Sequence, residues 1–278
     1  MSTQPTILIT GANRGIGKAT AAGVAARGAR VLLVGRSQAA MEASRAEIID
    51  ATGNQRVEVM IGDLSSQAEI RRMAREAEQR LDRLDVLINN AGVVVPQRRE
   101  SVDGLEMQFA LNHMAYFQLT RELQGLLAAS APSRVVNVSS EAHRRCGGMH
   151  WDDLHFNTGY TALRAYCQSK LANILFSREL ARRLRGTGVS VNSLHPGVIA
   201  TGLLGTFLKV PKRAHFLMRW CFPGPEKGAR TSIHLALAED QATTGCYFKD
   251  CRRTEPSPPA RDDAAAARLW EESESLLV

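Results

Sequence analysis

A tyrosine and a lysine stand four residues apart in a stretch with helical periodicity. Tyr166 and Lys170 belong to the segment 163–184, whose apolar spacing predicts a helix. Residues four apart share one helix face, so we expect the lysine ammonium beside the phenol. A nearby ammonium favours the phenolate and lowers a tyrosine pKa from its ordinary value of about 10. The pair is therefore a candidate for proton exchange with a substrate oxygen, although the same spacing also arises by chance in helices.

Two serines and an asparagine supply further hydrogen-bonding groups. Ser139 and Ser140 follow the apolar run 135–138, so a hydroxyl there can hydrogen-bond a substrate oxygen and position it. The alternative is a pair of turn serines. Asn112 falls inside a predicted helix, where asparagine is intrinsically disfavoured, so we expect its side chain to make hydrogen bonds.

A glycine-rich turn follows the first apolar run and precedes a helical pattern. Glycines let such a backbone turn sharply and approach a pyrophosphate, and the following helix offers free N–H groups and a partial positive charge. The spacing differs from both the G-x-G-x-x-G fingerprint and the P-loop, and the turn alone is equally compatible with binding nothing. The residues predicted to contact a dinucleotide here are Gly11, Asn13, Arg14, Gly15, Ile16 and Gly17.

Two arginines indicate which dinucleotide is bound. The second apolar run ends at Val34-Gly35-Arg36, where a sheet that binds NAD usually offers a carboxylate to the ribose 2′-hydroxyl. Arg14 lies in the glycine turn and is expected to face the same point. Two guanidinium groups suit a 2′-phosphate, so we predict NADP(H) as the cofactor. The alternative is that either arginine is only a charged surface residue that contacts no cofactor.

Short apolar runs alternate with longer amphipathic stretches over the first 200 residues. The runs are rich in β-branched residues and bounded by Gly, Asp or Asn, which is typical of buried strands. Strands that alternate with helices predict an α/β fold, a doubly wound parallel sheet of about seven strands with helices on both faces. The runs are 7–9, 31–34, 57–59, 86–88, 135–138 and 189–191, and helices are predicted over 70–81, 163–184 and 262–277.

No linker or internal repeat divides the chain, so we expect a single domain over residues 1–278. Its cofactor half is about 1–140, and its catalytic and substrate half is about 141–278. Within the second half, 141–162 forms a long connection. The mixed apolar and basic stretch 202–223 is predicted to be a substrate lid; docking on a membrane surface is the less favoured alternative.

The composition limits the remaining function classes. The net charge is +7, but the arginines are scattered and not interleaved with aromatic residues, so we predict no nucleic-acid partner. The seven histidines form no convincing ligand set, and we predict no metal. Five cysteines, an odd number without paired spacing, suggest reduced thiols. We find no signal peptide and no apolar run near the roughly 20 residues that span a bilayer, so we expect a cytoplasmic protein.

Taken together, the motifs resemble the short-chain dehydrogenase/reductase family, which has a Rossmann fold. They follow the family's order and spacing across nearly the whole chain. Each motif alone is weak, but the set is specific. The matching features are Thr10-Gly11-x-x-x-Gly15-x-Gly17, Asp63-Leu64, Asn89-Asn90-Ala91-Gly92, Asn112, Ser139-Ser140, Tyr166-x-x-x-Lys170 and Pro196-Gly197 with Thr201.

The resemblance implies a role for each matching residue. Tyr166 would be the acid–base residue, Lys170 its partner and a ligand of the nicotinamide ribose, Ser140 the residue that orients the substrate, and Asn112 the holder of a proton-relay water. The residues implied at the cofactor, besides the glycine turn, Arg36, Tyr166 and Lys170, are Asp63, Leu64, Asn90, Ala91, Gly92, Pro196, Gly197, Ile199 and Thr201.

A closer resemblance is to the retinol-dehydrogenase-like branch of that family. It rests on Gly11 to Lys18, Ala165 to Asn173, His195-Pro196-Gly197 and the tail Gly245 to Cys251. This branch implies reduction of a lipophilic carbonyl, or oxidation of the matching alcohol, with NADP(H). A steroid or xenobiotic ketone is an alternative substrate, and a non-catalytic NADP(H)-binding protein is an alternative function. Relatives commonly self-associate, so a homo-oligomer is compatible with the resemblance.

Overall fold

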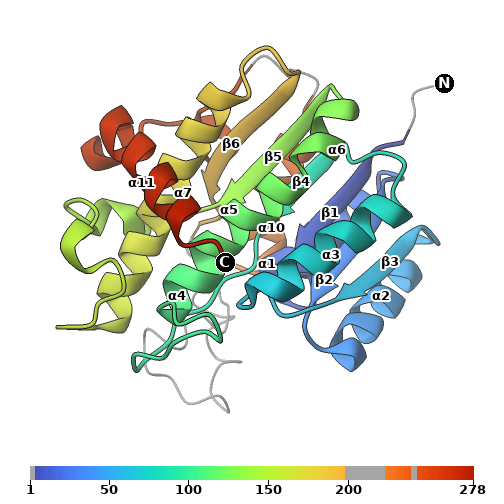
Figure 1. Cartoon of the computed structure of the whole chain (residues 1–278). Helices are drawn as coiled ribbons and strands as arrows, with labels where there is room; N and C mark the ends of the chain where they lie inside the picture. The colour runs from blue at the N-terminus through green and yellow to red at the C-terminus, as the bar shows by residue number, and fades with distance from the viewer. Residues whose placement is uncertain (1–3, 198–222, 239–242) are drawn as a thin grey trace.

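One mixed sheet runs through the computed structural model, which describes residues 4–197, 223–238 and 243–278 (Figure 1). Its strands lie in the order β3-β2-β1-β4-β5-β6-β7-β8; each pairing is parallel except that of β7 with β8. The predicted doubly wound parallel sheet is confirmed, with a short antiparallel strand added. The strands are β1 (Thr6–Thr10), β2 (Arg30–Gly35), β3 (Val57–Ile61), β4 (Val86–Asn89), β5 (Ser133–Val138), β6 (Val189–His195), β7 (Tyr247–Lys249) and β8 (Arg252–Arg253).

The central strands bury side chains on both faces, which is why their sequences are nearly continuous apolar runs. Along β1 and β2, Leu8 and Leu32 belong to the core on one face, whereas Ile7 and Val31 belong to the core on the other. All four side chains are almost completely buried. Alternate residues of a strand point to opposite faces, so each apolar run supplies both cores.

Two layers of helices cover the sheet (Figure 1). On one face, α1 (Gly15–Ala25), α2 (Gln38–Thr52) and α10 (Pro225–Leu237) contribute to one core. On the other face, α3 (Gln67–Arg80), α5 (Ala115–Glu122) and α7 (Ala162–Arg183) contribute to the second core, and α11 (Asp263–Ser275) packs against α7. The three helices whose ends were predicted from the sequence are α3, α7 and α11, each within three residues of its expected ends.

Short elements connect these layers. A π-helix, η1 (Ala110–Met114), joins α4 (Met107–Phe109) to α5, and α6 (Gln124–Ala129) precedes β5. Three 3-10 turns are η2 (Glu141–Arg145), η3 (Trp151–Asp153) and η5 (Pro258–Arg261). Within the described ranges, no helix is long and apolar enough to cross a membrane. The predicted lid 202–223 lies outside the described residues except for its last position.

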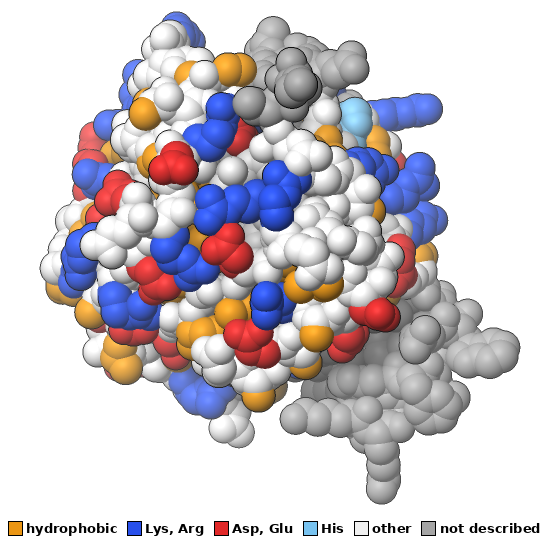
Figure 2. All heavy atoms as spheres, turned by 90° about the vertical axis from the view of Figure 1, so that its right-hand side faces the viewer, with side chains coloured by type: hydrophobic (Ala, Val, Ile, Leu, Met, Phe, Trp, Pro, Cys, Tyr) orange, Lys and Arg blue, Asp and Glu red, His pale blue; other side chains and the backbone are white. Residues whose placement is uncertain are grey.

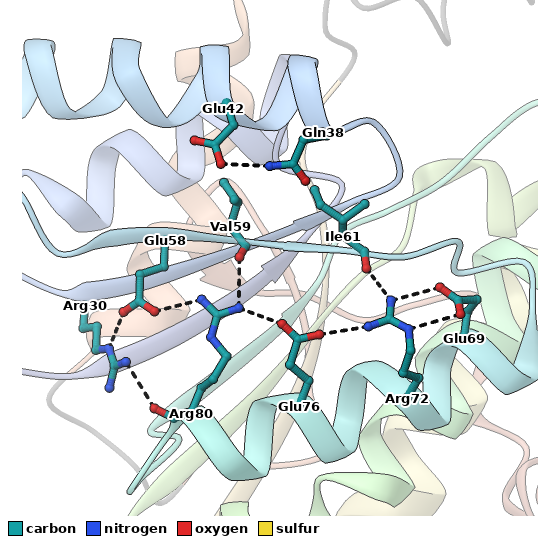
Figure 3. A network of polar contacts seen from close by, with 10 residues as sticks. All are labelled: Arg30, Gln38, Glu42, Glu58, Val59, Ile61, Glu69, Arg72, Glu76 and Arg80. Atoms are coloured by element: carbon teal, nitrogen blue, oxygen red, sulfur yellow. Dashed lines mark hydrogen bonds and ion pairs between the residues drawn. The ribbon is translucent and has the colours of Figure 1, made fainter.

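Arginine side chains line the outer edge of the sheet at β3, which has no second neighbouring strand among the described residues (Figure 3). An edge strand presents unpaired carbonyl groups at alternate residues, and each of these is a site where another strand can add. Guanidinium groups from α2 and α3 donate to three such carbonyl groups. The pairs are Arg45 with Val57, Arg80 with Val59 and Arg72 with Ile61.

Arg72 and Arg80 belong to a chain of ion pairs along α3 and β3 (Figure 3). Glu76 pairs with both Arg72 and Arg80 at 2.9 Å, and Arg80 also reaches Glu58 at 2.9 Å. These pairs hold the guanidinium groups where they meet the strand. Figure 2 shows acidic and basic side chains interspersed over this side of the molecule.

The centre of the sheet contains the point where the chain reverses its winding direction. β1 and β4 are neighbours there, although they are far apart in the chain. In open α/β sheets, ligands bind in the crevice outside the carboxyl ends of the strands at this point. The turns that follow β1, β4, β5 and β6 all begin at this edge, and several of the predicted site residues lie in them.

Candidate active site

The turn after β1 packs directly against the turn after β4. Gly11 has a φ of +67°, and a Cβ there would lie only 2.8 Å from the Cα of Ala91. At Gly17, a Cβ would collide with the carbonyl oxygen of Gly11. The Asn90 amide donates to the Thr10 carbonyl at 2.8 Å, which ties the two turns together. Only glycine allows the backbone to pass so closely at these two positions.

The N-terminus of α1 is open to an anion. Arg14 precedes the helix in an extended conformation, its own side chain does not cap the first turn, and that turn holds no acidic residue. The first amides of a helix have no partner within the helix, so they remain available to a ligand and carry a partial positive charge. Together with the glycine turn, this arrangement fits the pyrophosphate of a dinucleotide.

Arg14 and Arg36 lie in neighbouring loops at the same edge. They follow β1 and β2, which pair in parallel with Thr10 opposite Val34. The Gly11 amide also donates to the Val34 carbonyl at 2.8 Å, which holds the starts of the two loops together. Both arginine side chains are exposed. Their placement is compatible with joint contact with one phosphate.

The other predicted cofactor residues are distributed along the same edge of the sheet. Asp63 follows β3, and its carboxylate accepts from the Ser65 amide at 2.9 Å and the Ser65 hydroxyl at 2.7 Å. Its neighbour Leu64 is buried in the core. Pro196 and Gly197 follow β6 and are half-buried, whereas Ile199 and Thr201 lie outside the described residues.

Tyr166 and Ser140 meet at the carboxyl end of β5. Tyr166 lies in the second turn of α7 and is 8% exposed, and Ser140 immediately precedes η2. Burial raises the pKa of Tyr166 to about 12, and a hydrogen bond with the Ser140 hydroxyl opposes that rise. The adjacent Ser139 instead donates to the Lys170 carbonyl at 2.7 Å. The geometry therefore distinguishes the two serines, and Ser140 is the one beside the phenol.

Lys170 lies on the same side of α7 as Tyr166. Its Nζ is 5.7 Å from the centre of the Tyr166 ring and donates to the Val138 carbonyl at 2.9 Å. Burial lowers the pKa of Lys170 to about 7. Burial is the largest influence on the phenol, and it raises the Tyr166 pKa, whereas the sequence predicts that the lysine lowers it.

Asn112 lies in the π-helix η1, and its side chain makes hydrogen bonds through both its oxygen and its nitrogen. The amide oxygen accepts from the Val93 N–H at 2.8 Å, and the amide nitrogen donates to the Val93 carbonyl and the Ser169 hydroxyl, each at 3.0 Å. The side chain therefore joins the turn after β4 to α7. The predicted hydrogen bonds are present; they use both amide donors, and the amide oxygen keeps a second acceptor position.

Histidines near the site behave differently from one another. His113 is completely buried and bonds Ser273 at 2.8 Å, so it packs within the core. His195 accepts from the Glu141 amide at 3.2 Å, directly beside Ser140. His143, buried next to Ser140, was not predicted from the sequence. The spacing Ser140-x-x-His143 after a strand was the available signal. Within the described residues, no three His, Cys, Asp or Glu side chains are grouped to hold a metal.

Comparison with known proteins agrees with this geometry. The family model for short chain dehydrogenases matches residues 5–209. Retinol dehydrogenase 14 of Mus musculus is 44% identical over 98% of this chain and 85% of its own length. Retinol dehydrogenase 13 of Homo sapiens is 43% identical over 98% of this chain and 84% of its own length. The chain therefore belongs to the short-chain dehydrogenase family, in its retinol-dehydrogenase-like branch.

Solved structures share the fold. An uncharacterized protein from Mycobacterium paratuberculosis superposes with a TM-score of 0.81 and 32% identity, covering 99% of this chain and 93% of that one. The NADP complex of RhlG from Pseudomonas aeruginosa gives a TM-score of 0.70 and 29% identity, covering 88% and 93%. Together with the site geometry, these matches define an oxidoreductase of alcohols and carbonyls that uses a nicotinamide cofactor.

Proposed function

We propose that this protein is an NADP(H)-dependent oxidoreductase that interconverts a lipophilic aldehyde or ketone and the matching alcohol. The observation that carries the proposal is the hydrogen bond between Ser140 and Tyr166, with Lys170 on the same side of the helix. The three groups lie at the edge of the sheet where the glycine turn also ends. A proton-transfer group thus stands beside a site that fits a dinucleotide.

These residues divide the chemistry between them. A bound nicotinamide supplies or accepts the hydride. In the reduction direction, Ser140 and Tyr166 hydrogen-bond the carbonyl oxygen, and Tyr166 donates its proton as charge develops there. Lys170 stabilises the tyrosinate that remains. With a pKa raised by burial, the Tyr166 phenol carries at neutral pH the proton that it donates to the substrate oxygen.

Arg14 and Arg36 support the choice of NADP(H) over NAD(H). Their loops follow neighbouring parallel strands, and a carboxylate that would repel a 2′-phosphate is replaced by arginine at position 36. Two of the solved relatives, RhlG and a short chain dehydrogenase from Escherichia coli CFT073, are complexes with NADP and NADPH respectively. We assign the same cofactor to this chain.

The lipophilic substrate is inferred from the relatives named retinol dehydrogenase, which match almost the whole chain. The test is oxidation of NADPH by the purified full chain with retinal, other lipophilic aldehydes, a steroid ketone and aromatic ketones. NADH is measured in parallel, and Tyr166→Phe is the control for chemistry. Turnover with NADPH well above NADH, lost in the variant, is the expected result. Binding of NADPH without turnover of any carbonyl would refute the enzymatic proposal, and a preference for NADH would refute the cofactor.

A further inference from the structure

The peptide group that follows Ser140 is held at both of its ends by histidine rings. Its carbonyl oxygen accepts from Nδ1 of His143 at 2.6 Å and from the His143 main-chain N–H at 3.1 Å. Its N–H, which belongs to Glu141, donates to Nδ1 of His195 at 3.2 Å. The C=O and N–H of a trans peptide point in opposite directions, so the two imidazoles hydrogen-bond the same planar peptide group from opposite sides.

The hydrogen bonds assign opposite tautomers to the two histidines. The Ser257 N–H donates to Nε2 of His143 at 3.0 Å, so that nitrogen has no proton and Nδ1 carries it. His195 accepts at Nδ1, so its proton lies on Nε2. Both rings are buried, and this burial lowers the pKa of His143 and lowers that of His195 to about 4. Both histidines are therefore neutral at pH 7, as these tautomers require.

The turn that carries these contacts has further anchors. The Tyr247 hydroxyl donates to Glu141 at 2.9 Å, and the same carboxylate pairs with Arg144 at 3.2 Å and Lys249 at 3.6 Å. The Tyr247 ring packs against the His143 ring at 5.1 Å between centroids. The start of η2 is thereby tied to β6, β7 and the segment before η5, so the histidines act on a turn that is already restrained.

The Ser140 hydroxyl has little freedom once this peptide group is fixed. It accepts from the Ala142 N–H at 3.2 Å, which leaves its own proton for the Tyr166 oxygen. We propose that His143 and His195 are positioning residues that hold the 140–141 peptide group and so aim the Ser140 hydroxyl at Tyr166. The inference rests on the proposed function, since it gives Ser140 its role. It assigns each histidine a specific nitrogen and a specific partner.

Two substitutions at position 143 separate this role from simple packing. In His143→Asn, the amide nitrogen takes the place of Nδ1, so the bond to Ser140 is retained and the one to Ser257 is lost. In His143→Gln, the amide group takes the place of Nε2, so the bond to Ser257 is retained and the one to Ser140 is lost. We expect His143→Asn to keep most of the wild-type kcat and His143→Gln to lose about 10- to 100-fold, because catalytic groups tolerate little displacement.

The cofactor and the fold serve as controls in the same experiment. The NADPH dissociation constant, from fluorescence titration, and the melting temperature should be similar in the two variants. At position 195, His195→Asn retains an acceptor for the Glu141 N–H, whereas His195→Leu removes it. We expect His195→Leu to have a lower kcat than wild type and His195→Asn to have a kcat close to that of wild type. Equal kcat values for His143→Asn and His143→Gln would overturn the inference, and so would a larger loss in His143→Asn.

An NMR measurement keeps the inference testable if the proposed function fails. Wild-type full-length protein with ¹⁵N-labelled histidine gives imidazole ¹⁵N shifts that identify each tautomer, and spectra of the conservative variants assign the two rings. We expect Nδ1–H for His143 and Nε2–H for His195. A protonated Nε2 on His143 would overturn the inference even in an active enzyme. The expected tautomers with no turnover of any carbonyl would refute the proposed function and leave the histidine contacts standing.

Discussion

Lys170 donates a hydrogen bond of 2.9 Å to the main-chain carbonyl of Val138. Val138 is the last residue of β5, two positions before Ser140, and its carbonyl also accepts from Asn173 at 3.3 Å. The lysine thus ties α7 to the strand end that carries the serine. Because Lys170 is almost fully buried, at 3% exposure, the charge of its ammonium is also costly to the fold.

This cost makes the stability of the protein depend on pH through Lys170. Burial lowers its pKa to about 7 in the folded chain from an ordinary value of 10.5, so between these values the unfolded chain binds more protons than the folded one. Stability therefore rises with pH across this window. We expect the free energy of unfolding of wild type, measured by urea denaturation, to rise from pH 7 to pH 9 relative to that of Lys170→Met. The difference between the two free energies of unfolding should grow by at most about 1.4 kcal/mol per pH unit.

The unfolding free energies of wild type and Lys170→Met, each plotted against pH, must be compared with each other, because other groups titrate in both proteins. Lys18, at the surface, provides the matched control, since Lys18→Met removes a lysine that is half-buried and paired with Glu47. Its curve should run parallel to that of wild type. If the curves of wild type and Lys170→Met also run parallel, Lys170 is charged in the folded protein over this range.

Asn112 offers a second test, because its side chain contributes to the fold as well as to the site. Asn112→Ala leaves the N–H and the carbonyl of Val93 without the partners they have at 2.8 and 3.0 Å. An unsatisfied buried polar group costs about 1–3 kcal/mol. We expect a loss of that size in the free energy of unfolding by urea denaturation, together with reduced turnover. A variant with wild-type stability and low turnover would show that the amide acts on catalysis alone.

The outcomes at these positions show which parts of the site a sequence can predict. The strands were predictable because burial on both faces produces continuous apolar runs, as in β1 and β2. The placement of Tyr166 beside Lys170 was predictable because helix geometry relates residues four apart. The pKa of Tyr166 could not be predicted from the sequence, because it depends on how many groups from distant segments bury the ring. His143 was missed for a similar reason: its partner Ser257 lies 114 residues further along the chain.

Cofactor preference gives a third test, at Arg14 and Arg36. If both guanidinium groups hold a 2′-phosphate, Arg14→Ala and Arg36→Ala should each weaken NADPH binding by about 10- to 100-fold, because a hydrogen bond to a charged group contributes about 1.5–3 kcal/mol. NADH binding should be unchanged. Fluorescence titration measures both constants. Arg252→Ala, in the exposed strand β8 at the far end of the sheet, makes the same change of charge and should leave both constants as in wild type. An equal loss for the two cofactors would argue against contact with the 2′-phosphate.

The edge strand β3 gives the last test, at the two arginines of α3 that meet its carbonyl groups. Arg80 donates to Val59 at 3.0 Å, and Arg72 donates to Ile61. Replacing both by methionine exposes these carbonyl groups and leaves Glu76 without its two cationic partners. We expect the free energy of unfolding to fall by about 1–3 kcal/mol because two carbonyl contacts are lost. We also expect soluble oligomers to form, in amounts that increase with protein concentration.

Light scattering over a concentration series and urea denaturation measure these two effects. Arg75→Met is the matched control, because Arg75 is exposed on the same helix and the substitution is the same. Restoring one arginine at a time should recover part of each effect, since each guanidinium covers a different carbonyl group. If the double variant stays monodisperse at every concentration where Arg75→Met does, the arginines stabilise the ion-pair chain but do not protect the edge of the sheet.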